Sequence, residues 1–219
     1  MKNRHILLFT ILSLLLLMLF LVDLAFGSIR IPIESIPDIL LNRKGVGIEL
    51  EILLNFRLPK ALTAIIAGAS LSVAGLMMQT LFRNPLADPY ILGVSSGASL
   101  GVALITMASA MLPVMLVSSG WAMIISAIAG ASVVLLLVVA VSFRVQSSVT
   151  LLIVGIMFGT IAGSVVSILQ NFSNPDAIKL FVMWTFGSLS AVTWDYMQVL
   201  LPVSLTGLGM AFLLHKKMD

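Results

Sequence analysis

The sequence contains no cysteine and only two histidines. Without cysteine the chain can form no disulfide, no thiolate metal site and no catalytic thiol. His5 and His215 lie near opposite ends of the chain, and neither shares a segment with a nucleophile that it could activate. We interpret both as solvated or interfacial side chains. We therefore expect no enzyme activity, no metal centre and no cofactor bound by the chain itself.

Charged residues are also scarce: they make up 10% of the chain, whereas apolar residues make up 60% and the mean hydropathy is +1.16. Soluble domains carry roughly a quarter charged residues. A chain this apolar needs a bilayer as its solvent. The net charge of +3 is small, and the basic residues are spread between apolar segments, so nucleic-acid binding has no support.

Two further patterns are missing. No segment matches the nucleotide-binding loop G-x-x-x-x-G-K-S/T, so any ATP that drives this protein is hydrolysed on another chain. The apolar segments hold no ionisable residue away from their ends, and Asp23 comes nearest to one. Proton or ion relays normally need such residues. Their absence favours a passage without charge chemistry, although unwound backbone can bind sodium in ion-coupled carriers.

The apolar residues form six segments that are long enough to span a membrane. The first runs from Ile6 to Phe26, about 21 residues. A signal peptide cleaved near Ala25-Phe26-Gly27 is the alternative, but its apolar region is usually only about 7–15 residues, so we expect a retained helix. The other five lie at 61–82, 90–110, 121–142, 149–170 and 194–214. We predict an all-α, polytopic helical bundle forming one transmembrane domain, residues 1–219.

Two connections between these spans carry helix signals of their own. Residues 27–60 are a polar connection in which a short helix can start at Ser35 and run through Leu41. Asn174-Pro175-Asp176 is a helix start, with a capping Asn, Pro at the first position and an acid in the first turn. That helix should stop near Gly187. About a dozen residues cannot cross a core of roughly 30 Å, so we expect a re-entrant or interfacial helix.

Small residues recur every fourth position on three of the predicted spans. This spacing lines them along one flank of a helix, where a neighbouring backbone can approach closely. We expect these residues to serve in helix packing. For the glycines of the span at 149–170, the alternative is that they line the translocation pathway, because a residue without a side chain leaves the pathway wider. The residues that we assign to packing are Gly68, Gly93, Gly97, Gly101 and Gly163, and those that we assign to a pathway are Gly155 and Gly159.

A polar turn at Arg83–Pro89 joins the second and third spans, and its two prolines each follow a short polar residue that favours turns. This turn is part of a longer pattern that resembles the permeases of ABC importers for iron chelates, haem and cobalamin. The pattern consists of Arg57-Leu-Pro-Lys60, the small-residue helix that ends near Gln79, and the run RNPLADPYILGVSSGA from Arg83. The order of these motifs matches over residues 57–101.

The resemblance implies a permease subunit that works with an ATP-binding subunit, an extracytoplasmic substrate-binding protein and a second permease copy in the inner membrane. In that family the basic residues matching Arg57 and Lys60 face acidic residues on the binding protein. Ser147 and Ser148 match a cluster that narrows the inner end of the pathway, although capping of the fifth span is the other interpretation. Trp184 matches the short outer gate helix, together with Gly187 and Trp194.

Six spans place both termini on one side of the membrane. With the termini inside, that side holds six basic residues (Lys2, Arg4, Arg83, Arg144, Lys216, Lys217), and the other side also holds six (Arg30, Arg43, Lys44, Arg57, Lys60, Lys179). The basic residues before the first span favour cytoplasmic termini, and the resemblance agrees.

Members of the family have ten helices, so this chain resembles their N-terminal two thirds. Two alternatives to a working permease therefore stay open: a truncated, non-transporting permease fragment and a small ion-coupled secondary transporter. The sequence leaves open which chelate is carried and whether the second copy is identical.

Overall fold

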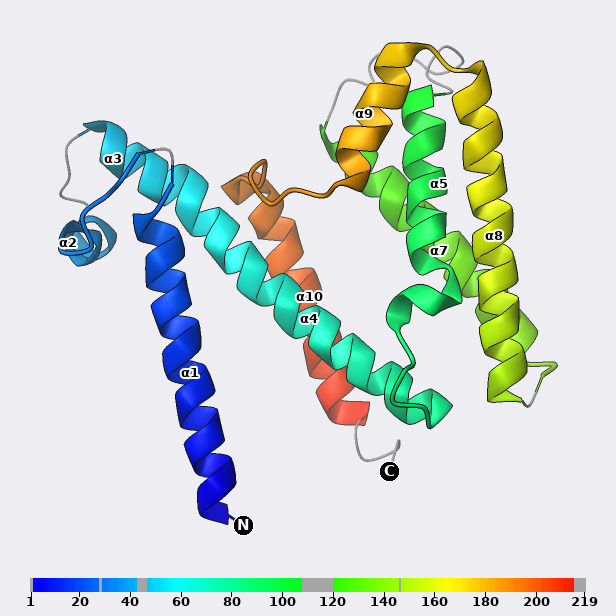
Figure 1. Cartoon of the computed structure of the whole chain (residues 1–219), viewed down its shortest axis with the longest axis horizontal. Helices are drawn as coiled ribbons and strands as arrows, with labels where there is room; N and C mark the ends of the chain where they lie inside the picture. The colour runs from blue at the N-terminus through cyan, green and yellow to red at the C-terminus, as the bar shows by residue number, and fades with distance from the viewer. Residues whose placement is uncertain (1, 28, 43–46, 108–119, 146, 215–219) are drawn as a thin grey trace. The chain divides into compact units, whose positions relative to one another are not determined.

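The computed structural model describes residues 2–27, 29–42, 47–107, 120–145 and 147–214, and every regular element in these ranges is helical (Figure 1). Five helical stretches in this part of the chain are long and apolar enough to cross a membrane. They are Arg4–Ala25, Gly47–Phe82, Gly120–Ser142, Ser148–Phe172 and Trp194–Leu214. The prediction of an all-α, polytopic fold is confirmed.

The third predicted span, at 90–110, differs from the other five. It begins with a 3-10 turn, η2 (Pro89–Leu92), and continues as α5 (Val94–Met107). The 14 residues of α5 rise about 21 Å, less than the roughly 30 Å of a hydrocarbon core. Residues 108–110 of that prediction lie outside the described residues.

The second predicted span starts earlier than the sequence indicates. Three helical pieces follow one another without a break: α3 (Gly47–Glu51), the π-helical turn η1 (Ile52–Arg57) and α4 (Leu58–Phe82). The prediction of a polar connection was therefore wrong for residues 47–60. The short helix predicted from Ser35 is confirmed as α2 (Ser35–Asn42).

The chain packs as two compact units, each described here by itself. The first holds residues 1–70 and 188–210: α1 (Lys2–Ala25), α2, α3, η1, the start of α4 and most of α10 (Trp194–Leu214). Its buried core lies where α1 ends, and comprises Leu24, Ala25, Ile31, Ile36, Ile39, Leu53 and Ala61. Whether the two units make one domain stays a prediction.

The second unit holds residues 71–187 and 211–219. In it α5 lies alongside α7 (Gly120–Ser142), α8 (Ser148–Phe172) and α9 (Pro175–Thr185), as Figure 1 shows. One buried cluster joins α5, α8 and α9 through Val102, Ala103, Val166 and Phe181. A second lies around the turn after α4 and includes Phe82, Ala87, Leu92 and Val138.

The caps of α9 follow its sequence signals. The Asn174 side chain accepts a hydrogen bond from the amide of Ala177 at 2.8 Å, and Pro175 is the first helical residue. Gly187 adopts a left-handed conformation, φ 70°, directly after the helix, where glycine is the residue of lowest cost. The predicted short helix is confirmed; its 11 residues rise about 16 Å and cannot span a bilayer.

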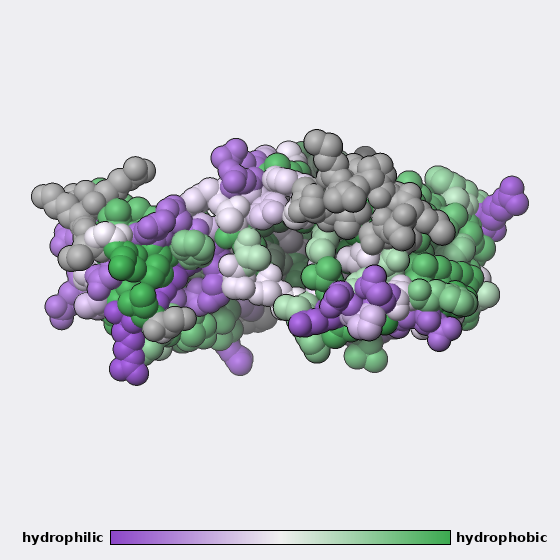
Figure 2. Space-filling model, turned by 90° about the horizontal axis from the view of Figure 1, so that it is seen from above, coloured by the Kyte–Doolittle hydropathy of each residue, from purple (hydrophilic) through white to green (hydrophobic). Residues whose placement is uncertain are grey.

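Large apolar side chains cover much of the surface. Hydrophobic residues reach the face shown in Figure 2 beside hydrophilic ones, and α1 exposes most of its Leu, Ile and Phe side chains. Water-soluble proteins rarely expose contiguous apolar patches of this extent. Lipid or partner subunits are the surroundings that suit such a surface.

Candidate functional site

Backbone-to-backbone contact joins α5 to α7. A Cβ added at Gly97 would lie 2.5 Å from the carbonyl oxygen of Gly130, and one added at Gly101 would lie 1.9 Å from that of Ser126. A side chain on the α7 side of the contact would fit no better, because a Cβ at Gly130 would lie 2.1 Å from the Gly97 oxygen. No side chain fits at these three positions. This is the close approach that the glycine spacing predicts.

The same kind of contact joins η2 to α8. Gly93 has φ 76°, and a Cβ there would also lie 2.8 Å from the carbonyl oxygen of Gly155. A Cβ at Gly155 would lie 2.7 Å from Cα of Leu92. Gly155 is buried in this contact, so within the described chain it packs against η2, and its role in a pathway stays a prediction.

Gly159 is only partly buried and lines a cavity, and its role in a pathway stays a prediction. It borders a space of about 350 Å³ with Ser96 of α5 and Thr160 of α8. Two other glycines that we assigned to packing, Gly68 and Gly163, lack the close contacts seen at the glycines of η2, α5 and α7. A Cβ at either would meet no heavy atom within 4 Å, so the predicted packing is not seen there within the described residues.

Local hydrogen bonds build the turn between α4 and η2. Arg83 adopts φ 47°, and the amide of Asn84 donates to the Gln79 carbonyl at 3.1 Å, which closes the end of α4. The Asn84 side chain accepts from the Leu86 amide at 2.9 Å, and that of Asp88 from the Tyr90 amide at 2.7 Å. The polar residues of the motif thus hold the turn in shape.

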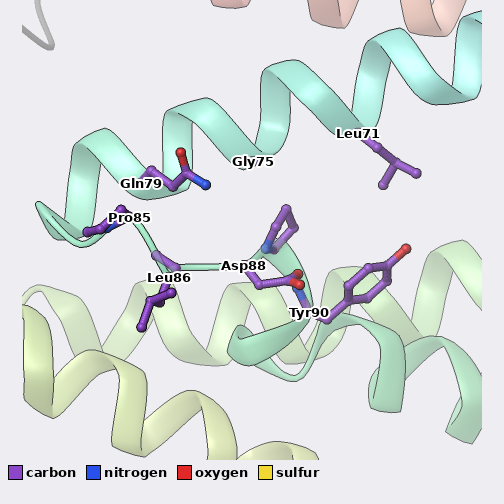
Figure 3. A pocket seen from close by; sticks show the side chains of 9 residues that line it. Leu71, Gly75, Gln79, Pro85, Leu86, Asp88 and Tyr90 are labelled. Carbon is purple, nitrogen blue, oxygen red and sulfur yellow. The ribbon is translucent and has the colours of Figure 1, made fainter.

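A cavity of about 380 Å³ lies between this turn and α4. Figure 3 shows Leu71 and Gln79 of α4 on one side and Leu86, Asp88 and Tyr90 on the other. Asp88 caps η2, so its carboxylate has a structural role. Among the described residues no group of three or more His, Cys, Asp or Glu side chains could hold a metal ion.

One face of α8 exposes small hydroxyl side chains. The hydroxyls of Thr160, Ser164 and Ser167 are exposed, and each donates to the carbonyl of the residue four positions earlier, at 2.8, 2.9 and 3.1 Å. Hydroxyls satisfied in this way are tolerated in lipid and also suit a polar passage. Their i, i+4, i+7 spacing in the sequence places these three residues on one face of the helix, which is the signal that could have predicted this surface.

The two serines at the start of α8 have different places. The Ser147 side chain accepts from the Thr150 amide at 3.4 Å, a long contact, in the N-cap position. Ser148 is the first helical residue. The capping interpretation therefore applies to Ser147, and the narrowing of a pathway by either serine stays a prediction.

Trp184 packs inside the second unit. Its ring stacks with that of Phe181, with ring centroids 6.5 Å apart, and it lies against the cluster formed by α5, α8 and α9. The side chain is half-buried, so α9 is held on α5 partly through this residue. Its role in a gate stays a prediction.

Arg57 is buried, with only 8% of its surface exposed. Its guanidinium donates to the carbonyls of Leu24 at 2.6 Å and Ala25 at 3.0 Å, and also to that of Ile29. Leu24 and Ala25 are the last residues of α1, whose carbonyls lack donors within the helix. Arg57 therefore caps α1, and within this chain its charge is not presented for docking.

Lys60 is more accessible than Arg57. Its ammonium pairs with the Asp23 carboxylate at 2.8 Å, and the two side chains are 41% and 37% exposed. An ion pair this exposed contributes about 0–1 kcal/mol. The pair ties the end of α1 to the start of α4 and leaves Lys60 within reach of a partner.

Comparisons with known proteins agree on one family. The model of the FecCD transport family matches residues 15–219. The hemin transport system permease protein HmuU of Yersinia pestis is 34% identical over 198 residues, covering 88% of this chain and 59% of that protein. The vitamin B12 import system permease protein BtuC of Citrobacter koseri is 36% identical over 153 residues, covering 68% of this chain and 45% of that protein.

A solved structure is similar over nearly the whole chain. It is an ABC transporter of metal-chelate type in an inward-facing conformation, with a TM-score of 0.79 and 26% identity, covering 94% of this chain and 61% of the other. This chain thus spans only about half the length of the curated relatives named above. With a family match over residues 15–219 and several helices able to cross a bilayer, the chain is a multi-pass membrane protein that belongs to the FecCD transport family.

Proposed function

We propose that this chain forms the membrane-spanning pathway of an ABC importer for a metal chelate such as an iron siderophore, haem or cobalamin. The family match over residues 15–219 carries the proposal, because the relatives named above are hemin and vitamin B12 permeases. The exposed hydroxyl face of α8 supplies a surface along which a polar chelate can pass. The chain performs no covalent chemistry.

The partners follow from the same proposal. An ATP-binding subunit supplies the energy, since the sequence has no nucleotide-binding loop, and the chain itself needs no cofactor. An extracytoplasmic binding protein delivers the chelate, and a second permease copy completes the pathway. The chain lies in the inner membrane with cytoplasmic termini. Ser147 and Ser148 narrow the inner end, and Trp184 acts in the outer gate.

Docking of the binding protein is assigned to Lys60 more than to Arg57, because only Lys60 is substantially exposed. Attraction between complementary charges on the two proteins raises the rate of such docking, and added salt weakens this attraction. Arg57 contributes by holding the end of α1 in place.

Chelate-dependent growth tests the proposal. A deletion strain is complemented with the gene and supplied with one chelate at a time; we expect growth on one chelate class. Changing the nucleotide loop of the partner ATPase should then abolish uptake. Uptake that survives this change would identify an ion-coupled carrier, and failure on every chelate, with the protein present in the membrane, would identify a non-transporting fragment.

A further inference from the structure

The backbone is irregular where η1 meets α4. In an α-helix the carbonyl of Leu54 would accept from the amide of Leu58, but that amide bonds the carbonyl of Leu53 instead. In a π-helix the donor would belong to residue 59, which is proline and has no N–H. Neither regular helical donor is available to the Leu54 carbonyl.

A side chain far along the sequence supplies the missing donor. The indole Nε1–H of Trp194, the first residue of α10, donates to the Leu54 carbonyl at 2.9 Å. The indole has one donor and no acceptor, so a single bond satisfies both groups. Because an unpaired carbonyl away from water is costly, the position of this indole matters to the helix junction as well as to α10.

A second contact lies about one turn further along α10, and it is made with α4. Thr63 of α4 donates to the Pro59 carbonyl at 2.7 Å, and its hydroxyl lies 3.1 Å from the sulfur of Met197. Met197 is 3% exposed. The first turn of α10 therefore touches η1 through Trp194 and α4 through Met197, and all of these residues lie in the first compact unit.

We infer that Trp194 is a positioning residue: its indole replaces the backbone donor that Pro59 lacks and fixes the start of α10 on the junction of η1 and α4. The connection from α9 ends at this fixed point and begins at Gly187, whose φ of 70° closes the end of α9. In the proposed importer, and resting on that proposal, this anchor fixes the C-terminal end of the connection between α9 and α10.

Two substitutions on opposite sides of the bond test the inference. Trp194→Phe keeps an aromatic ring but removes the N–H, and Pro59→Ala supplies an N–H at residue 59. We expect Trp194→Phe to lower the unfolding midpoint of the detergent-purified chain by about 2–4 °C, measured by circular dichroism. Adding Pro59→Ala should recover part of that loss, because the new amide can serve the Leu54 carbonyl.

Trp184→Phe is the matched control, since it makes the same chemical change at a ring stacked on Phe181. Pro59→Ala should not rescue it. An unchanged midpoint in Trp194→Phe, or effects of the two substitutions that simply add, would overturn the inference. If Trp194→Phe cannot be purified, recovery of the folded double variant supports the inference and its failure overturns it.

The absence of cysteine offers a second readout. A single cysteine introduced at the exposed Ala191, between Gly187 and Trp194, can be labelled with a water-soluble maleimide. We expect labelling several-fold faster in Trp194→Phe and slower again when Pro59→Ala is added. Equal rates would contradict the anchoring of this connection. Neither readout measures transport, so failure of the anchor and failure of the proposed function are distinguishable.

Discussion

Arg57 shows how one charged residue can be placed within an apolar protein. A buried charge is costly unless its hydrogen bonds are made, and here three backbone carbonyls accept from the guanidinium. Gly27 lies directly against it: a Cβ there would be 2.6 Å from a guanidinium nitrogen. The lack of a side chain at Gly27 is thus what lets Arg57 reach the end of α1.

The substitution Gly27→Ala should therefore displace the guanidinium and leave the Leu24 carbonyl at the end of α1 without its donor, while the Ala25 carbonyl keeps the amide of Ile31. We expect a loss of about 1–3 kcal/mol in the free energy of unfolding, measured on the purified chain in detergent. Gly207→Ala is the control, because a Cβ there would meet nothing within 4 Å. A Gly27→Ala variant as stable as the control would show that Arg57 does not cap α1.

This cap could not have been predicted from the sequence. The three acceptors of Arg57 lie 33, 32 and 28 residues earlier in the chain, and no periodic pattern links them. A basic residue beside an apolar span is usually an interfacial anchor, and the family resemblance implied docking for Arg57. The missing information was the path of the chain between α1 and η1.

At the scale of elements, the contacts between helices depend on the glycines with no room for a Cβ. The Cβ of Gly101→Ala would lie 1.9 Å from a backbone oxygen of α7, which cannot move aside as a flexible side chain can. We expect this variant to lose about 1–3 kcal/mol of stability by overpacking. The unfolding midpoint in detergent measures it.

Gly163→Ala is its matched control on α8, where a Cβ meets no heavy atom within 4 Å. Replacing a helical glycine by alanine without a clash stabilises a helix by up to about 1 kcal/mol. The two variants should therefore shift the midpoint in opposite directions. Equal shifts would mean that the contact between α5 and α7 is looser than described.

Local signals predicted the helices that they directly mark. Asn174, Pro175 and Gly187 bound α9 as expected, because caps act within one turn of a helix. The predicted start of the second span came too late in the chain, because Glu49, Glu51 and Pro59 are residues typical of a loop. The π-helical turn changes the hydrogen-bond register just before Pro59, and long-range contacts of Arg57 and Trp194 hold it. Such contacts are invisible to a local pattern.

At the scale of the whole molecule, docking of a binding protein depends on which charges are accessible. We expect Lys60→Glu to weaken binding of the matched binding protein to the assembled transporter, with a larger effect at low salt. Asp23→Asn breaks the same ion pair but keeps the charge of Lys60. It should bind normally. Equal loss in both variants would assign the effect to the ion pair and not to docking.

In the proposed importer, one face of α8 lines the passage of the chelate. Because the natural chain has no cysteine, single cysteines can be placed at Thr160, Ser164 and Ser167, and at Ile161, Val165 and Ile168 about 100° around the helix. We predict that in the assembled transporter a water-soluble maleimide labels the first three and that the transported chelate slows this labelling. The second three should resist. Labelling that is absent from the first three, or equal on both faces, would contradict the claim.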